Sequence, residues 1–253
     1  MLTLAGLVVG LAIGLTGVGG GVLTAPILIL VFGLAPGPSV GTALLFSSCV
    51  KVLSAGVYLL RRQVHGRTLL LLLAGGVPGA IAGPLLLQRL TAGKAAPGTE
   101  AWLLAFVGGM VCLTAAYSLV RAWMPGGARQ ARPAWLPLFS FPIGMEVGFS
   151  SAGAGALGTV LLFNWTDLEP AKVVGTDLLF GLAVSACAGG VHMASGNWDA
   201  GVLVKLLLGG IPGALAGAQL AVRVSARPLR ATVLGWAILL GILLAWQGLQ
   251  KAT

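Results

Sequence analysis

The stretch 14-GLTGVGGGVLTAP-26 breaks a long apolar run close to the start of the chain. Five glycines lie within the eight positions from 14 to 21. Glycine weakens a helix, and in lipid a broken helix is tolerated only where its freed backbone groups line a cavity or lie buried in protein. The stretch therefore predicts a membrane helix that is interrupted at a functional position.

The composition indicates an integral membrane protein, which we place in the plasma (inner) membrane. Of the 253 residues, 57% are hydrophobic and only 8% are charged, whereas roughly a quarter of the residues of a soluble domain are charged. Several uncharged runs approach or exceed the ~18 apolar residues that indicate a spanning helix. The net charge is +9, but the Arg and Lys residues lie mostly in short connectors, where they set membrane topology. Binding to nucleic acid is therefore not expected.

The chain matches itself when it is shifted by 134 residues. The first break then falls on 148-GFSSAGAGAL-157, and 40-VGTALLF-46 falls on 174-VGTDLLF-180. In the same register, 75-GGVPGAIAG-83 falls on 209-GGIPGALAG-217. Three separated motifs in one register indicate an internal duplication. For the third motif we favour close helix packing through small residues over a functional role.

Each half contains four apolar elements, separated by connectors rich in Pro, Gly and charge. We expect an all-α polytopic fold with a first transmembrane repeat at 1–125, a cytoplasmic linker at 126–135 and a second repeat at 136–253. The expected elements are 1–34 (interrupted at 17–21), 38–60, 66–90, 100–123, 136–164 (interrupted at 150–155), 171–194, 200–222 and 228–250.

The two interrupted elements are either strongly tilted, kinked spans or re-entrant hairpins. Each piece is too short for the ~30 Å hydrocarbon core, and the charges of the connectors favour hairpins. With 61-RRQVHGR-67 in the cytoplasm, hairpins also place the basic connector 223-RVSARPLR-230 there and the acidic 195-SGNWD-199 outside. Each repeat then has three true spans, so the second repeat is inverted relative to the first, as in many secondary transporters.

The breaks offer a binding site for an anion. Helix starts expose unpaired N–H groups and carry partial positive charge, and glycine lets a ligand approach the backbone closely. Ser150 and Ser151 add hydroxyl groups at the second break. The alternative is close packing of small residues. The predicted substrate-binding residues of the two breaks are Gly17, Gly19, Gly20, Gly21, Ser150, Ser151, Gly153 and Gly155.

Few ionisable residues lie within the spans, and each has a functional and a structural interpretation. Lys51 either pairs with an anionic substrate or snorkels. Glu146 either carries a proton or satisfies the broken backbone. Asp177 either couples transport to protons or caps the start of the sixth element. Thr42 and Thr176, matched in the two VGT motifs, either bind substrate or bond back to their own helix.

The remaining candidates have structural interpretations. His192 lies near a helix end, where we expect it to anchor the helix at the membrane interface. Cys49, Cys112 and Cys187 lie inside apolar elements without paired spacing, which argues against a disulfide framework or a zinc site. No nucleotide-binding motif is present, so neither a metal nor a cofactor is expected.

The glycine-rich break followed by proline, the VGT motif and the GG-x-PGA-x-AG helix, each present twice, resemble the TauE/SafE family of sulfite-exporter-like membrane permeases. The resemblance covers nearly the whole chain, and it implies export of sulfite or of organosulfonates. In the second break Ser and Ala replace glycines, and Val160 stands where the first copy has Pro26. Family members are usually described with seven or eight transmembrane segments, and eight full spans would make the repeats parallel.

The expected function is therefore secondary transport of a small sulfur-containing anion by alternating access, coupled to protons, with no enzymatic activity. A passive anion channel of the same fold is the first alternative. The second is an intramembrane hydrolase that uses a serine of 148-GFSS-151 and His192. The oligomeric state is not predicted.

Overall fold

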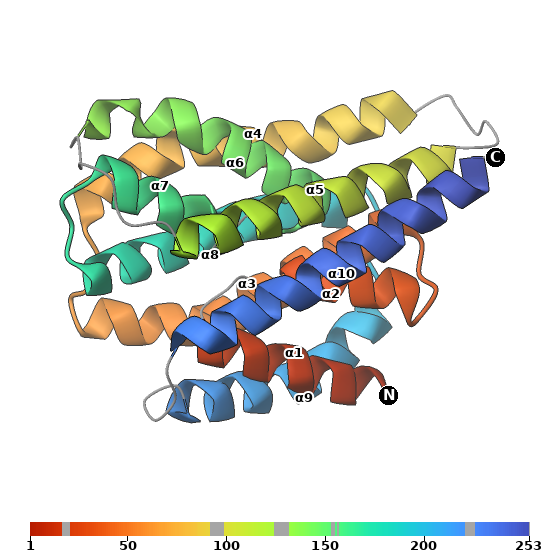
Figure 1. The fold of residues 1–253 in the computed structure, drawn as a ribbon, viewed down its shortest axis with the longest axis horizontal. Coiled ribbons are helices and arrows are strands. Elements are labelled where there is room, and N and C mark those ends of the chain that lie inside the picture. Colours follow the sequence, from red (N-terminus) through yellow and green to blue (C-terminus); the bar gives the residue numbers. More distant parts are fainter. Residues whose placement is uncertain are drawn as a thin grey trace.

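The computed structural model describes residues 1–16, 21–91, 99–123, 132–152, 155, 157–220 and 226–252. These residues are helical and contain no strand, which confirms the predicted all-α class (Figure 1). The elements are α1 (Leu2–Thr16), α2 (Gly21–Leu30), α3 (Pro36–Leu60), α4 (Gly66–Thr91), α5 (Thr99–Trp123), a 3-10 turn (Pro133–Trp135), α6 (Leu136–Ser150), α7 (Leu157–Trp165), α8 (Pro170–Ala194), α9 (Ala200–Leu220) and α10 (Ala226–Ala252).

Helix length separates two kinds of element. In the described part of the chain, six helices are long and apolar enough to cross a membrane, three from each half: α3, α4, α5, α8, α9 and α10. By contrast α1, α2, α6 and α7 have 15, 10, 15 and 9 residues. At about 1.5 Å per residue, none of these four reaches across a hydrocarbon core of about 30 Å. The interruption predicted at 150–155 is confirmed, because α6 ends at Ser150 and α7 begins at Leu157.

Contacts at the ends of the interrupted segments show which residues lie beside them. The N–H of Arg132, just before α6, donates to the carbonyl of Trp165 at the end of α7, over 3.2 Å. In the other half, Gly6 of α1 packs on Leu206 near the start of α9, and Gly37 in the first turn of α3 packs on Asn197 just before α9.

The two halves pack crosswise (Figure 1). The main partner of α1 is α9, and that of α6 is α4, so the first helix of each half lies on the third element of the other half. The equivalent elements α3 and α8 pack on each other, and so do α5 and α10. This exchange of equivalent contacts is expected of two similar halves related by a pseudo-two-fold axis.

The glycines of the third motif explain why these helices pack so closely. A Cβ added to Gly209 would lie 1.8 Å from the Thr3 carbonyl oxygen, and one added to Gly75 would lie 1.8 Å from the Pro137 carbonyl oxygen. The neighbouring Gly210 and Gly76 face the rings of Phe46 and Phe180, each at 2.3 Å. Each of these contacts has its counterpart 134 residues away, and the packing role predicted for this motif is confirmed.

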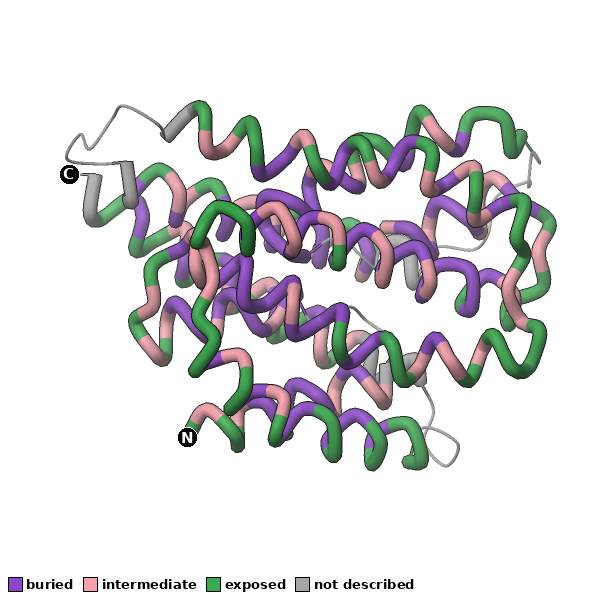
Figure 2. The backbone as a smooth tube through the Cα atoms, turned by 180° about the vertical axis from the view of Figure 1, so that it is seen from behind, coloured by how far each residue is buried: buried purple, intermediate pink, exposed green. Residues whose placement is uncertain are grey.

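Large apolar side chains remain on the outside of the bundle. Leu70, Trp102, Leu113, Leu208 and Trp246 are all exposed, and Figure 2 shows exposed residues along the outer faces and buried residues between the helices. Apolar patches of this extent need a partner, which in a membrane protein is lipid. Cys49, Cys112 and Cys187 are free thiols, of which Cys49 is exposed.

Replacing Gly209 or Gly75 by alanine should destabilise the protein. The new methyl group would meet a backbone oxygen that cannot swing away, and overpacking of this kind costs about 1–3 kcal/mol. Gly109, in the middle of α5, is the matched control because a Cβ there meets nothing within 4 Å. Thermal unfolding in detergent should show a lower Tm for Gly209→Ala and Gly75→Ala and an unchanged or higher Tm for Gly109→Ala. Equal Tm values for all three variants would contradict this packing.

Candidate functional site

The two breaks meet inside the bundle. The Ser151 hydroxyl donates to the carbonyl oxygen of Gly21 over 3.0 Å, and a Cβ on Gly21 would lie only 1.8 Å from the Ser151 carbonyl oxygen. Ser151 is buried and adopts a left-handed conformation with φ +64°, which ends α6. The first residue of α2 therefore rests directly on the residue that follows α6.

A buried carboxylate organises the start of the second break. Glu146 Oε1 accepts hydrogen bonds from the hydroxyl groups of Ser150, over 2.6 Å, and of Thr114 in α5, over 3.1 Å. The Ser150 hydroxyl oxygen in turn accepts the N–H of Ala152 over 3.1 Å. Glu146 thus holds the Ser150 hydroxyl, and that hydroxyl accepts a backbone N–H of the break. These contacts agree with the structural interpretation of Glu146. A role in proton transfer stays a prediction.

The end of α6 is also held by a histidine. His192 Nε2 lies 3.0 Å from the Gly148 carbonyl oxygen, one of the carbonyl groups that the end of the helix leaves without an intrahelical partner. The side chain is only 1% exposed. The expectation that His192 anchors α8 at the membrane interface is therefore wrong, because its ring is turned inward to the broken helix.

Asp177 contacts the second break from its other side. The hydroxyl of Thr159, in the first turn of α7, hydrogen-bonds to Asp177 Oδ2 and lies 3.2 Å from the carbonyl oxygen of Gly155. Gly158 leaves room for the carboxylate, since a Cβ there would lie 2.0 Å from Asp177 Oδ1. The alternative in which Asp177 caps its own helix is wrong, because α8 begins at Pro170 and Asp177 lies seven residues further on.

Lys51 is the buried cation of this region. It lies in α3, is 1% exposed, and its ammonium group makes no hydrogen bond to any residue that the structure describes. Asp177 acts on it electrostatically. A buried cation without a hydrogen-bonding partner is costly.

The two threonines of the VGT motifs hold connectors between helices. The Thr42 hydroxyl oxygen accepts the N–H of Asp199, and the Thr176 hydroxyl oxygen accepts the N–H of His65, both over 3.0 Å. Each threonine thus holds the connector of the opposite half, in two contacts related by the 134-residue shift. Neither hydroxyl bonds back to its own helix in these contacts, and a role in substrate binding stays a prediction.

Other predicted site residues cannot be placed. Gly17, Gly19, Gly20 and Gly153 lie outside the described residues. Gly155 is described and has φ +96°, a conformation that disfavours any side chain. Sequence reasoning missed Thr114 and Thr159, whose hydroxyls bind the two acids, because a threonine inside an apolar run carries no signal of its own.

The contacts of the serines give no support to a hydrolase. Ser150 donates to Glu146 and Ser151 donates to Gly21, while His192 is held by the carbonyl group of Gly148. A serine nucleophile needs a base within hydrogen-bonding distance of its hydroxyl. No contact between His192 and either serine is found in the described part of the site.

Comparison with known proteins gives the same class of function. The family model "Sulfite exporter TauE/SafE" matches residues 2–244. The chain is 30% identical over 236 residues to the "Probable membrane transporter protein YjnA" of Bacillus subtilis (strain 168), covering 90% of this chain and 92% of that protein. No solved structure matches. Since both findings cover almost the whole length, the chain belongs to the TauE/SafE sulfite exporter family and is a membrane transporter rather than an enzyme.

Proposed function

We propose that this protein is a secondary transporter of the plasma (inner) membrane that exports a small sulfur-containing anion, sulfite or an organosulfonate, by alternating access. The observation that carries the proposal is the buried ammonium group of Lys51, which has no hydrogen-bonding partner among the described residues. An anion bound beside Lys51 would supply the missing partner and offset the cost of burying the charge.

The arrangement of the halves supports alternating access. In the proposal, the segments α1–α2 and α6–α7 are re-entrant hairpins that enter from opposite faces of the membrane, so the second repeat is inverted. The contact between Ser151 and Gly21 then joins the two hairpins within the bilayer. Connector 61–65, with Arg61 and Arg62, lies in the cytoplasm by the positive-inside rule. Connector 195–199 and the C-terminal end of α10 lie on the opposite side of the membrane, outside the cell.

Charge balance gives a reason for proton coupling. Lys51, Glu146 and Asp177 are all buried, and with both acids ionised the group carries a net charge of about −1, which opposes an entering anion. A proton on one acid removes this opposition. By linkage, the anion must then favour proton binding to the same extent, so the two move together.

Asp177 is the acid that we assign to the proton. The single hydroxyl hydrogen of Thr159 faces two acceptors, the carboxylate of Asp177 and the carbonyl oxygen of Gly155. The hydroxyl can donate to only one of them at a time. When Asp177 is protonated, it donates to Thr159, and Thr159 is free to donate to Gly155. Protonation thus stabilises one arrangement of the second break.

The purified protein in liposomes should move sulfite when a pH gradient is imposed, and the flux should vanish when the gradient is collapsed. Protein-free liposomes under the same gradient measure leakage of the neutral acid and are the control. Flux that is indifferent to the pH gradient would indicate a channel of the same fold. Absence of flux for sulfite and for every organosulfonate tested would refute the proposal.

Lys51→Met should abolish transport. Methionine has a similar volume but no charge, so the anion loses its main partner. We expect KM to rise at least about tenfold, or activity to be lost. Lys205→Met is the matched control, because Lys205 is an exposed lysine of α9. A Lys51→Met protein that transports normally would contradict this role.

Asp177→Asn should uncouple the anion from protons. The amide keeps an oxygen for Thr159 but cannot ionise, so exchange of anion across the membrane should persist while uphill accumulation driven by the pH gradient is lost. Glu146→Gln is the comparison variant. Glu146 is the other buried acid, and we assign it the contact with Ser150 instead of the proton. Uphill accumulation by Asp177→Asn at the rate of the unmodified protein would show that the proton is carried elsewhere.

A further inference from the structure

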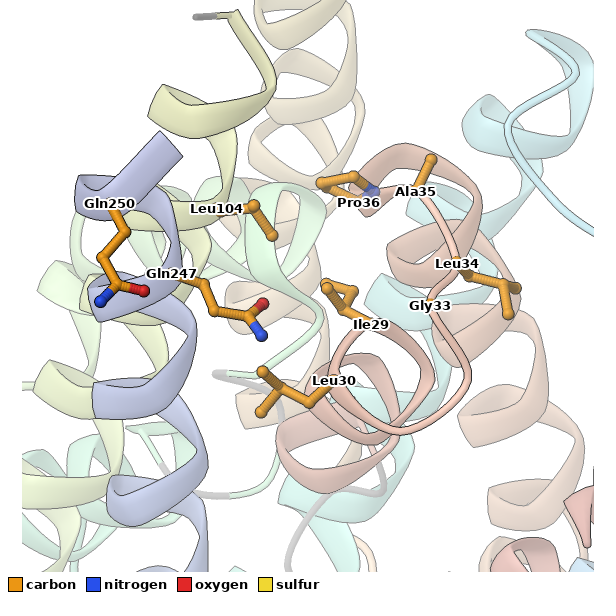
Figure 3. Close-up of a pocket in the computed structure, with 9 residues that line it drawn as sticks. All are labelled: Ile29, Leu30, Gly33, Leu34, Ala35, Pro36, Leu104, Gln247 and Gln250. Carbon is orange, nitrogen blue, oxygen red and sulfur yellow. The ribbon is translucent and has the colours of Figure 1, made fainter. Parts of the chain in front are cut away.

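A cavity of about 550 Å³ opens at the end of the bundle where α2 ends and α10 approaches its C-terminus (Figure 3). Its walls are Ile29 and Leu30 of α2, the connector 33–36, Leu104 of α5, and Gln247 and Gln250 of α10. The volume is that of a small-molecule site and is ample for a small oxyanion. Its place at the outer end distinguishes it from the central site at the breaks.

The polar side chains of the cavity come from α10. In Figure 3 the amide group of Gln247 points into the cavity, toward Ile29 and Leu30, and Gln250 lies one turn further along the helix. A glutamine amide offers two N–H donors without a charge. Such a group binds an oxyanion more weakly than a lysine does, which suits a position from which the anion has to leave.

Helix α2 lies between this cavity and the breaks. It extends from Gly21, which contacts Ser151, to Leu30 at the cavity wall, and its 10 residues span about 15 Å. Val22, Ala25 and Ile29 along α2 are buried in the same apolar cluster as Leu104. An anion therefore cannot pass between the two places unless α2 moves.

The C-terminal end of α2 permits such a movement. Gly33, three residues beyond Leu30, has φ +66°, with nothing within 4 Å of a Cβ placed there. Pro26 in the middle of the helix removes one backbone hydrogen bond. A short helix that contains a proline and is followed by an uncrowded glycine has a hinge of the kind expected of a gate.

We propose that this cavity is the outer vestibule of the anion path, that Gln247 binds the sulfur oxyanion there, and that α2 separates the vestibule from the central site. The inference rests on the proposed function and extends it to a second place on the path and to the element that gates it. The anion then meets neutral donors in the vestibule and the ammonium group of Lys51 at the centre.

Cysteine labelling tests the vestibule. Gln247→Cys protein in liposomes is treated from outside with a membrane-impermeant maleimide that carries a sulfonate group, and the reagent is washed away before flux is measured. The thioether product is stable to sulfite, whereas a disulfide label would be cleaved by it. The labelled fraction is read as a mass shift, and sulfite uptake should fall in proportion to it.

Leu249→Cys is the matched control, because Leu249 is exposed in the same turn of α10 but does not line the cavity. Labelling at this position should leave uptake unchanged. The unmodified protein shows how much of the maleimide the three native cysteines take up. Ala35→Cys, in the opposite wall, replaces Gln247→Cys if that variant does not fold, and the same fall in uptake is expected.

The outcomes separate the two proposals. Normal uptake that labelling of both wall positions leaves unchanged, or wall positions that the reagent never reaches, would overturn the vestibule alone. Absence of uptake by the unlabelled protein for every sulfur anion would overturn the proposed function, and the vestibule with it. An excess of sulfoacetate, which does not react with maleimides, should also slow labelling of Gln247→Cys at least about twofold if this anion is a ligand of the vestibule.

Discussion

The structure depends on how an interrupted helix is satisfied inside an apolar bundle. A break frees backbone N–H and C=O groups, and each group left without a partner in lipid costs several kcal/mol. Around the second break the partners come from several elements: Ser151 donates to Gly21, Ser150 accepts from Ala152, and His192 binds the carbonyl group of Gly148. The second break is thus stabilised from within its own half, by Ser150 and His192, and from the other half, through Gly21.

The frame that holds the breaks is repeated, whereas the charges are not. Glycine contacts, the crosswise helix pairs and the threonine contacts at the connectors all recur 134 residues apart. Lys51, Glu146 and Asp177 correspond instead to Ser185, Ala12 and Ala43. In the proposed transporter, the repeated frame would give the bundle two equivalent closed states, and the unrepeated charges would let ions change the balance between these states.

Much of this fold could be predicted from the sequence, because glycine, proline and charge mark helix ends and breaks directly. The all-α class and the break before α7 were readable in this way. The partners of the breaks were not. His192, Thr114 and Thr159 are ordinary residues in apolar runs, and only the packing of α8, α5 and α7 brings them to Gly148, Glu146 and Asp177. The VGT threonines illustrate the same limit, since their partners lie 157 and 111 residues away.

The central claim is that a sulfur oxyanion binds between the breaks beside Lys51. An experimental structure of the protein with bound sulfite tests it most directly. The account predicts density for the anion within hydrogen-bonding distance of Lys51 Nζ and of backbone N–H groups at one or both breaks. Density for the anion at another place in the bundle, with the Lys51 ammonium group paired to a protein carboxylate, would contradict it.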